Sequence, residues 1–365
     1  MSLKVTLVRL PLLDPFSSSY GTESRRNALI LELDGGDGIE AVSECTTDED
    51  LRYGHEDNSI ALHLIKDFLG EAVKGERPPA PEEFVGRVNR IRDHQMSKAS
   101  VEMLLWDYRA KSDGRPLAEA MGRPRGYAEA GVSLGIAKTE VMVDRIGAAL
   151  DRGYKRVKVK IEKGRGHEIL KAARDRFPEA PLSADANGCF DIQKDLAELR
   201  RIDRFDLQYL EQPLGFDDIL DHAELAKKVS TPICLDESIT TTERARQALE
   251  IGAASVINVK PGRVGGISAA MEIARTTRKE RCHAWVGGML ETGVGRAFNV
   301  ALASQELFDY PGDTSPNDRY WERDIVRNPF VMEAGRISPN AGPGAGVELD
   351  RAFLAKATVK SWKIF

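Results

Sequence analysis

The chain has few cysteines and no cysteine motif. Its four cysteines, Cys45, Cys189, Cys234 and Cys282, lie far apart, and no two of them form a CxxC pair. Scattered single cysteines in a chain of this length are typical of reduced thiols, not of a disulfide framework. We therefore expect a cytoplasmic protein without structural disulfides.

Long runs of one chemical character are also missing. No apolar segment approaches the ~20 residues that a membrane-spanning helix needs, and the N-terminus lacks the shape of a signal peptide. No basic stretch is long enough to follow a phosphate backbone, and the net charge of −5 argues against nucleic acid as a partner. With 42% hydrophobic and 30% charged residues in 365, the composition is globular and the chain is long enough for more than one domain.

The first third of the chain groups its strands before its helices. Strand patterns occupy residues 3–12, 26–33 and 39–45, and helix patterns occupy residues 59–73, 81–94 and 97–114. The glycine-rich stretch from Asp34 to Gly38 predicts a hairpin between the second and third strands. Ser97 is the expected N-cap of the last helix. Strands followed by helices indicate an α+β domain.

From about Gly126 the pattern changes to a regular alternation of strands and helices. Strand candidates occupy residues 129–136, 156–161, 181–187, 207–213, 231–238, 255–260 and 284–290. Seven βα units of this spacing predict a parallel sheet, and at this number a TIM-type barrel is favoured over an open sheet. An eighth strand has only a weak candidate, "ELFDY" at 306–310. We predict domains at 1–125 and 126–328, and a C-terminal segment, 329–365, that returns to the first domain.

Five of the strand candidates carry a charged residue at or just before their carboxyl end. Lys160, Asp185, Glu211, Asp236 and Lys260 follow one another at intervals of 25, 26, 25 and 24 residues, one βα unit each. The carboxyl ends of barrel strands form the active-site face, and adjacent strands lie about 4.8 Å apart, so the three carboxylates are expected to converge. Converging carboxylates repel each other, and a hard divalent cation with oxygen ligands, Mg²⁺ or Mn²⁺, relieves the repulsion. A single such acid is more often a helix cap or a surface charge, but the regular set favours a metal site.

Two lysines share one face of the strand "VKVKI". Lys158 and Lys160 are two residues apart, a pattern that in isolation usually means a half-exposed strand. Lys160 and Lys260 are expected four strands apart in an eight-stranded barrel, on opposite walls of its mouth. This favours a β-strand whose two lysines point into the barrel and not to solvent. The Lys158 charge and the metal are expected to lower the pKa of Lys160, so that it can remove a proton α to a carboxylate. A lysine or histidine base with one or two Mg²⁺ ions is the solution that enolase-superfamily enzymes use.

The whole chain resembles the enolase superfamily, in the muconate lactonizing enzyme subgroup. The greatest resemblance is to the o-succinylbenzoate synthase and N-succinylamino acid racemase (N-acylamino acid racemase) family. The similar segments are, in order, GVSLGI, VKVKI, DANG, YLEQPL, CLDES, INVKPGRVGG, GGMLETGVGRA and PGDTSPNDRYWERDI. The resemblance implies an α/β fold, a modified (β/α)7β TIM barrel with an N-terminal α+β capping domain, which accounts for the missing eighth unit. It also implies one Mg²⁺ or Mn²⁺ per site.

The resemblance assigns a role to each site residue. The metal ligands are Asp185, Glu211 and Asp236; the catalytic lysines are Lys160, the base, and Lys260 on the opposite face. The neighbouring residues are Lys158, which keeps the pKa of Lys160 low, and Asn187. The substrate-binding residues are Ser133, Gly287, Gly288 and Met289 in the barrel, and Phe16, Ser19 and Tyr20 in the lid. Apart from the resemblance, Arg263 lies three residues after Lys260 and is always charged, so it is expected to lower the pKa of Lys260.

Related reactions are partly excluded by the same segments. A mandelate-racemase-like base histidine would end the seventh strand, but His283 begins it, and "LFDYPGDTS" lacks the Asp-x-Asp of dipeptide epimerases. The expected substrate is a small carboxylate, with dehydration to 2-succinylbenzoate on the menaquinone route as the expected reaction. Racemisation of N-succinyl amino acids is the alternative, followed by a muconate-type cycloisomerase and a non-catalytic binding barrel. We expect a homo-oligomer with no nucleic-acid or membrane partner.

Overall fold

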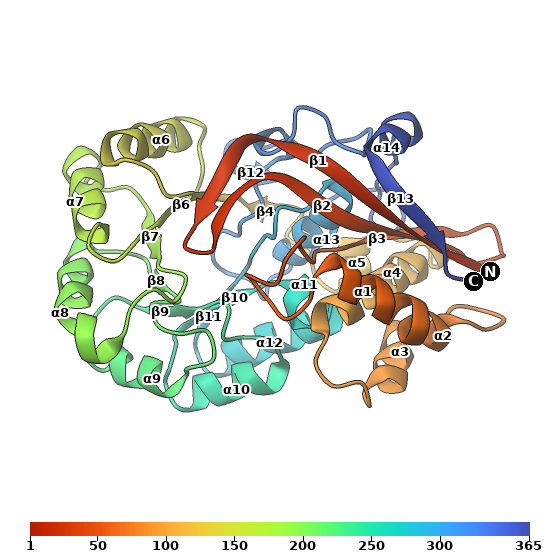
Figure 1. Cartoon of the computed structure of the whole chain (residues 1–365), viewed down its shortest axis with the longest axis horizontal. Helices are drawn as coiled ribbons and strands as arrows, with labels where there is room; N and C mark the ends of the chain where they lie inside the picture. The colour runs from red at the N-terminus through yellow and green to blue at the C-terminus, as the bar shows by residue number, and fades with distance from the viewer.

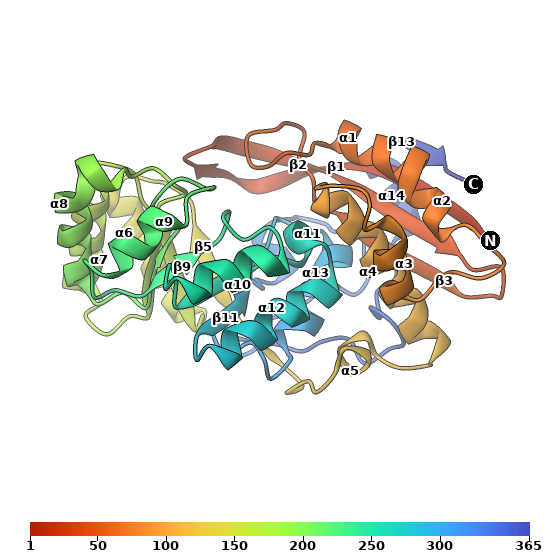
Figure 2. The same cartoon turned by 90° about the horizontal axis from the view of Figure 1, so that it is seen from below.

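The N-terminal strands form one long antiparallel hairpin that reaches from the chain ends to the barrel (Figures 1 and 2). The strands of this sheet are β1 (Ser2–Ser18), β2 (Gly21–Asp34), β3 (Glu40–Cys45) and β13 (Thr358–Lys363), in the order β13-β1-β2-β3. In this computed structural model, which describes residues 1–365, β1 and β2 pair from Ser2 and Asp34 onward. After an irregularity the pairing resumes at Phe16 and Glu23, so the hairpin tip continues as a two-stranded lid.

The helices of the capping domain, except the last, pack on one side of this sheet. They are α1 (Asn58–Leu64), the π-helical turn η1 (Ile65–Leu69), α2 (Gly70–Val73), α3 (Pro81–Val88), α4 (Gln95–Ser112) and α5 (Leu117–Met121). The last helix, α5, packs against α4 and against α13 (Gly293–Ala303) of the barrel. The expectation that Ser97 caps α4 is wrong, because the helix begins two residues earlier. Glu56 accepts the backbone N–H groups of Met96 and Ser97, and this carboxylate takes the place of a capping side chain.

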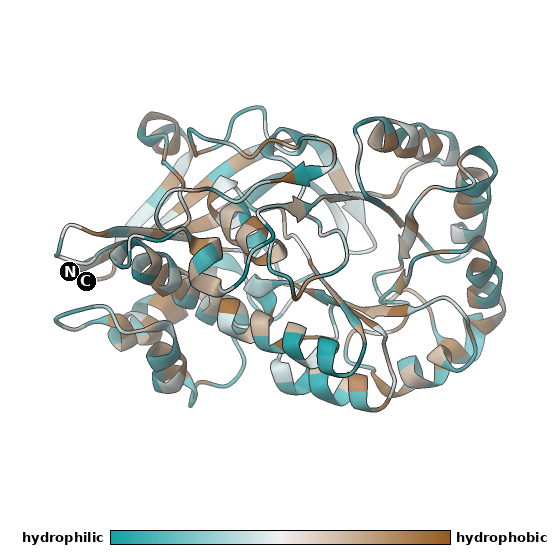
Figure 3. Cartoon of the chain, turned by 180° about the vertical axis from the view of Figure 1, so that it is seen from behind, coloured by the Kyte–Doolittle hydropathy of each residue, from teal (hydrophilic) through white to brown (hydrophobic).

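The second part of the chain is a curled parallel sheet surrounded by helices, as predicted. Its strands are β5 (Gly131–Leu134), β6 (Arg156–Lys160), β7 (Leu182–Asp185), β8 (Leu210–Glu211), β9 (Ile233–Leu235), β10 (Val256–Val259) and β11 (His283–Val286), neighbours in chain order. Its helices are α6 (Thr139–Asp151), α7 (Gly166–Arg176), α8 (Ile192–Ile202), α9 (Leu220–Ala226), α10 (Thr242–Glu250), α11 (Pro261–Val264), α12 (Ile267–Lys279) and α13 (Gly293–Ala303). Figure 3 shows the apolar residues gathered on the strands and the inner helix faces.

The eighth position of the barrel is taken by an irregular segment, residues 309–313. Asp309 and Asp313 donate backbone N–H groups to carbonyls of β11, and Gly131 of β5 donates to the Gly312 carbonyl. The segment therefore joins the two edge strands of the sheet, although only the Ala130–Gly312 bridge is regular. The candidate at 306–310 overlaps this segment at its end but does not form a strand.

The C-terminal residues run back along the capping domain. β12 (Arg336–Ile337) pairs with β4 (Ala128–Glu129), and after α14 (Arg351–Ala357) the last strand, β13, pairs antiparallel with β1. The two chain ends lie side by side (Figure 1). No helix is both long and apolar enough to cross a bilayer.

Two buried carboxylates of the capping domain bind the N-termini of barrel helices. Glu102 of α4 accepts the N–H groups of Ile267 and Ser268 at the start of α12. Glu44 of β3 accepts from Thr292 at the start of α13. Since a helix N-terminus carries unpaired N–H groups and partial positive charge, each contact fixes the cap on the barrel.

Candidate active site

Five charged side chains meet at the carboxyl end of the barrel sheet. Lys160, Asp185 and Glu211 are the last residues of β6, β7 and β8. In the strand register Lys160 lies directly beside Asp185, and Asp185 lies directly beside Glu211. Asp236 and Lys260 follow the last residues of β9 and β10. All five are buried, with exposures of 0–8%. The structure therefore brings together the residues that the strand spacing selected.

The burial of strand β6 shows which way Lys158 and Lys160 face. Its five residues are all buried, and Val157 and Val159 pack into the barrel core. Lys158 and Lys160 point to the other side, into the barrel mouth, where both line the cavity described below. Lys160 Nζ donates to Asp185 at 2.9 Å and to Asn187 Oδ1 at 2.5 Å.

The second lysine has a separate set of partners on the opposite wall. Lys260 Nζ donates to Asp236 at 2.9 Å and to the Tyr53 hydroxyl at 2.8 Å. Arg263 is 5% exposed, forms an ion pair with Asp236 and donates to the Tyr53 hydroxyl at 2.9 Å. Burial acts to lower the pKa of Lys260 and Arg263 adds to this, but Asp236 and Tyr53 outweigh both and raise the pKa above its ordinary value.

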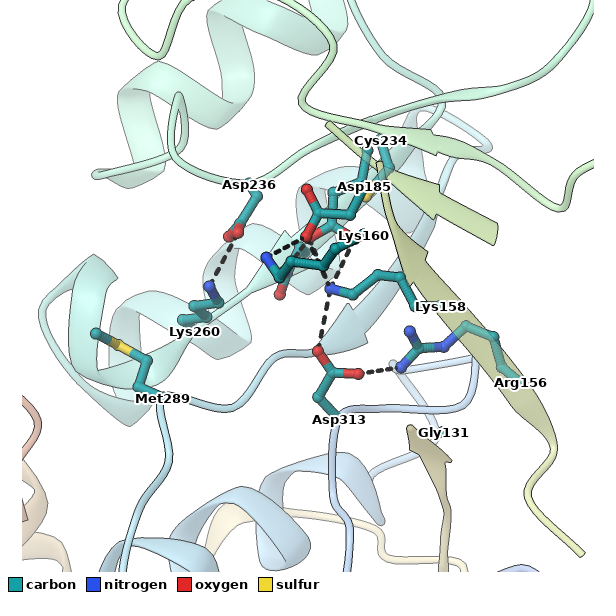
Figure 4. A network of polar contacts seen from close by, with 12 residues as sticks. Gly131, Arg156, Lys158, Lys160, Asp185, Cys234, Asp236, Lys260, Met289 and Asp313 are labelled. Atoms are coloured by element: carbon teal, nitrogen blue, oxygen red, sulfur yellow. Dashed lines mark hydrogen bonds and ion pairs between the residues drawn. The ribbon is translucent and has the colours of Figure 1, made fainter. Parts of the chain in front are cut away.

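Lys158 lies inside a cluster of carboxylates. It contacts Glu211 at 2.9 Å, Asp313 at 3.1 Å and Asp185 at 3.6 Å, and Arg156 holds Asp313 from the other side (Figure 4). Burial acts to lower the pKa of Lys158, but these carboxylates raise it well above the ordinary value. Opposite charges from three other segments surround Lys158 and decide the direction of its pKa.

The three predicted metal ligands do not converge on one point in this arrangement. No group of three His, Cys, Asp or Glu side chains is gathered closely enough to hold an ion, and Asp185, Glu211 and Asp236 instead form ion pairs with Lys158, Lys160 and Lys260. Their chemistry nevertheless fits a hard divalent ion, since they are buried oxygen donors at adjacent strand ends. Burial and the Asp185 carboxylate raise the pKa of Glu211, a sign of the repulsion that such an ion relieves.

A cavity of about 120 Å³ lies between the barrel mouth and the capping domain. The predicted substrate-binding residues that line it are Phe16, Tyr20, Ser133, Gly288 and Met289. Ser133 Oγ is buried without a hydrogen-bond partner, so it is free to bind a polar group of a ligand. The Tyr20 hydroxyl donates to Glu237 at 2.9 Å and thereby ties the lid to the barrel.

Two predicted substrate-binding residues do not line this cavity. Ser19 instead donates its hydroxyl to the Asn187 carbonyl at 3.4 Å. At Gly287 a Cβ atom would lie 2.0 Å from Asn258 Oδ1 and 2.7 Å from Lys260 Cγ. A side chain at position 287 would therefore clash with Asn258 and Lys260, which gives the glycine a packing role beside its predicted role in substrate binding.

Several site residues were missed by the sequence reasoning. Arg156 and Asn258 each lie two residues before a lysine of the site, so strand alternation could have found them. Asn258 donates to Glu211 at 3.0 Å. Asp313 and Tyr53 come from irregular segments, where no periodic signal exists. His283 begins β11 and pairs with Asp309, at the far end of that strand from the lysines.

Comparison with known proteins assigns the class. Residues 1–122 match the mandelate racemase / muconate lactonizing enzyme N-terminal domain, and residues 141–353 match the enolase C-terminal domain-like family. The chain belongs to this family of the enolase superfamily, whose enzymes depend on a divalent metal ion.

Individual relatives are similar over nearly the whole length. The o-succinylbenzoate synthase of Bacillus subtilis is 40% identical over 359 residues, with 98% of this chain and 96% of the relative covered. The N-succinylamino acid racemase of Thermus thermophilus is 41% identical over 357 residues, with the same coverage. A solved enolase-superfamily structure from Listeria innocua superposes with a TM-score of 0.95 at 37% identity, covering 100% of this chain and 98% of that one.

Proposed function

We propose that this protein removes a proton α to the carboxylate of a small molecule bound in the cavity. The observation that carries the proposal is the pair of buried lysines, Lys160 and Lys260, which line one cavity from opposite sides of the barrel sheet. Asp185, Glu211 and Asp236 would hold Mg²⁺ or Mn²⁺, since their oxygen-only donor set suits these ions. The bound ion would bind the substrate carboxylate and stabilise the negative charge that proton removal creates on it.

The reaction best supported by the relatives is that of an o-succinylbenzoate synthase. In 2-succinyl-6-hydroxy-2,4-cyclohexadiene-1-carboxylate the ring carbon beside the carboxylate loses its proton to Lys160 Nζ. The hydroxyl on the neighbouring ring carbon takes up that proton from the Lys160 ammonium and leaves as water, so that Lys160 returns to its neutral form and the ring becomes aromatic. Lys260 stays protonated under the influence of Asp236 and stabilises the developing negative charge from the other face.

A second activity, racemisation of N-succinyl amino acids, is favoured by one feature of the site. Racemisation needs a proton to leave one face of the α-carbon and a proton to return to the other face. Lys160 and Lys260 are held by different carboxylates, Asp185 and Asp236, so each is positioned independently of the other. Relatives named N-succinylamino acid racemase also support this activity.

Hydrogen exchange in D₂O with Mg²⁺ tests both activities through the lysines. With Lys260→Ala, one enantiomer of an N-succinyl amino acid should still exchange its α-proton, while racemisation is lost. With Lys160→Ala, the enantiomer preference should reverse, and dehydration should also be lost. If either variant exchanges both enantiomers at the wild-type rate, the lysines are not the two bases. If the wild-type protein exchanges neither and dehydrates nothing, the barrel is a binding protein.

A further inference from the structure

The wall of the cavity contributed by the capping domain is rich in charge. Opposite the barrel lysines, the hairpin and the loop after β3 place four carboxylates and two guanidinium groups on the cavity lining. They are Glu23, Asp48, Asp50, Glu56, Arg26 and Arg52. The reacting carbon lies against the barrel lysines, so the part of a substrate that points away from them meets this charged wall.

Most of these charges already have partners within the protein. Asp50 pairs with Arg52, and Asp48 pairs with Arg26 at 3.1 Å. Glu56 accepts the N–H groups at the start of α4. These acids are therefore compensated without a ligand.

Glu23 is the exception in this wall. It lies on β2 opposite Phe16 of β1, and the Phe16 ring lies 5.8 Å from Lys160 Nζ, so Glu23 faces the reaction centre from the lid. Neither Arg26 nor Arg52 forms an ion pair with Glu23, and the Oε2 atom of Glu23 is buried with no hydrogen-bond partner. A buried carboxylate oxygen without a partner is costly, so a donor on the ligand would stabilise this position.

The electrostatics of the neighbourhood agree with this geometry. Burial raises the pKa of Glu23, Arg26 opposes the increase, and the Asp48 carboxylate adds to it. Arg52 also opposes the increase, but its guanidinium pairs with Asp50, which leaves Arg26 to be shared by Glu23 and Asp48. A positive group brought in by a substrate would balance the second carboxylate.

We propose that Glu23, with Asp48 beside it, is a specificity-determining residue that selects substrates carrying a cationic group at the end away from the reacting carbon. For the racemase activity this class is the N-acyl amino acids with basic side chains. That the ligand is an N-acyl amino acid rests on the proposed function. That the ligand carries a cationic group rests only on the charges of the cavity wall.

Binding of a matched pair of ligands tests the proposal. N-succinyl-L-lysine and N-succinyl-L-norleucine share the acyl group and the length of the hydrocarbon side chain and differ by the ammonium group. Titration calorimetry of the Mg²⁺-loaded protein should show about tenfold or more tighter binding of the lysine derivative. Glu23→Gln keeps the shape and removes the charge, and it should bring the ratio of the two Kd values close to one.

Glu49→Gln is the control, because Glu49 lies next to Asp48 but pairs with Arg9 and Arg25 and does not line the cavity. It should keep the wild-type ratio. Equal or tighter binding of the norleucine derivative by the wild-type protein overturns the proposal, as does a wild-type ratio in Glu23→Gln. Racemisation of both ligands is measured in parallel. If neither ligand is racemised but the lysine derivative still binds more tightly, the racemase function is wrong and the role of Glu23 in binding is supported.

Discussion

Glu44 offers a quantitative test of how the capping domain is held on the barrel. It is 1% exposed, and it accepts the Thr292 hydroxyl at 2.6 Å and the backbone N–H groups of Thr292 and Gly295 at 3.0 Å each. Burial raises the pKa of Glu44 to about 7; the Thr292 hydrogen bond opposes the increase and the Glu291 carboxylate adds to it. The folded protein therefore holds the proton on this carboxyl more tightly than the unfolded chain does.

The sign of the pH dependence follows from this difference. Below pH 4.5, the ordinary pKa of the group, both states carry the proton and Glu44 contributes no penalty. Between about pH 4.5 and 7 the unfolded chain loses its proton first, so the free energy of unfolding falls as the pH rises. At 1.36 kcal/mol per pKa unit, the penalty is roughly 1 kcal/mol at pH 5 and about 3 kcal/mol at pH 8. Glutamine cannot ionise and avoids this change.

Denaturant unfolding of the wild-type protein and Glu44→Gln, measured at several pH values from 5 to 8, checks the argument. The stability of Glu44→Gln relative to the wild type should increase by about 2 kcal/mol over this range, whatever its value at pH 5. Glu49→Gln removes the same charge from an exposed side chain and should show little change. A difference between Glu44→Gln and the wild type that is independent of pH would refute the reasoning.

Two further predictions concern the chemistry. Glu211→Gln should abolish turnover, because a neutral ligand weakens a site whose carboxylates balance a divalent ion; full activity of this variant, or of the wild type after exhaustive chelation, removes the metal assignment. Arg263→Gln, assayed at saturating Mg²⁺, should reduce racemisation by about tenfold or more and dehydration less, because Arg263 acts on Lys260 through Asp236 and Tyr53 and only racemisation needs Lys260 as a base. Equal losses in both reactions contradict this role.

The position of the proposed catalytic and metal-binding side chains was predictable because two periodicities coincide in a barrel. Alternation within a strand decides which side chains face inward, and the length of a βα unit decides which strand ends are aligned. Together they located Lys160, Asp185, Glu211, Asp236 and Lys260. The start of α4 was mispredicted because no local pattern determines it. Its cap comes from Glu56, about forty residues earlier in the sequence.

The direction in which the site shifts the pKa of its lysines could not be predicted from these periodicities. Strand periodicity shows that Lys158 and Lys160 share a face, and like charges on one face suggest lowered pKa values. It does not show that Asp313 arrives from the segment that closes the barrel, or that Lys158 also meets the carboxylates of β7 and β8. A pKa depends on the sum over all neighbours, so the pattern of one strand cannot give the direction of the pKa of Lys158.

The glutamates of the capping domain show why one of them is expected to serve a ligand. Glu44, Glu56 and Glu102 are buried, and each accepts the N–H groups at the start of a helix, α13, α4 and α12. A carboxylate in such a position stabilises the fold and needs nothing more. Glu23 is partly buried in the same domain, but no helix begins beside its Oε2 atom and no cation pairs with it. In the proposal above, its missing partner comes from the cavity, where the substrate would bind.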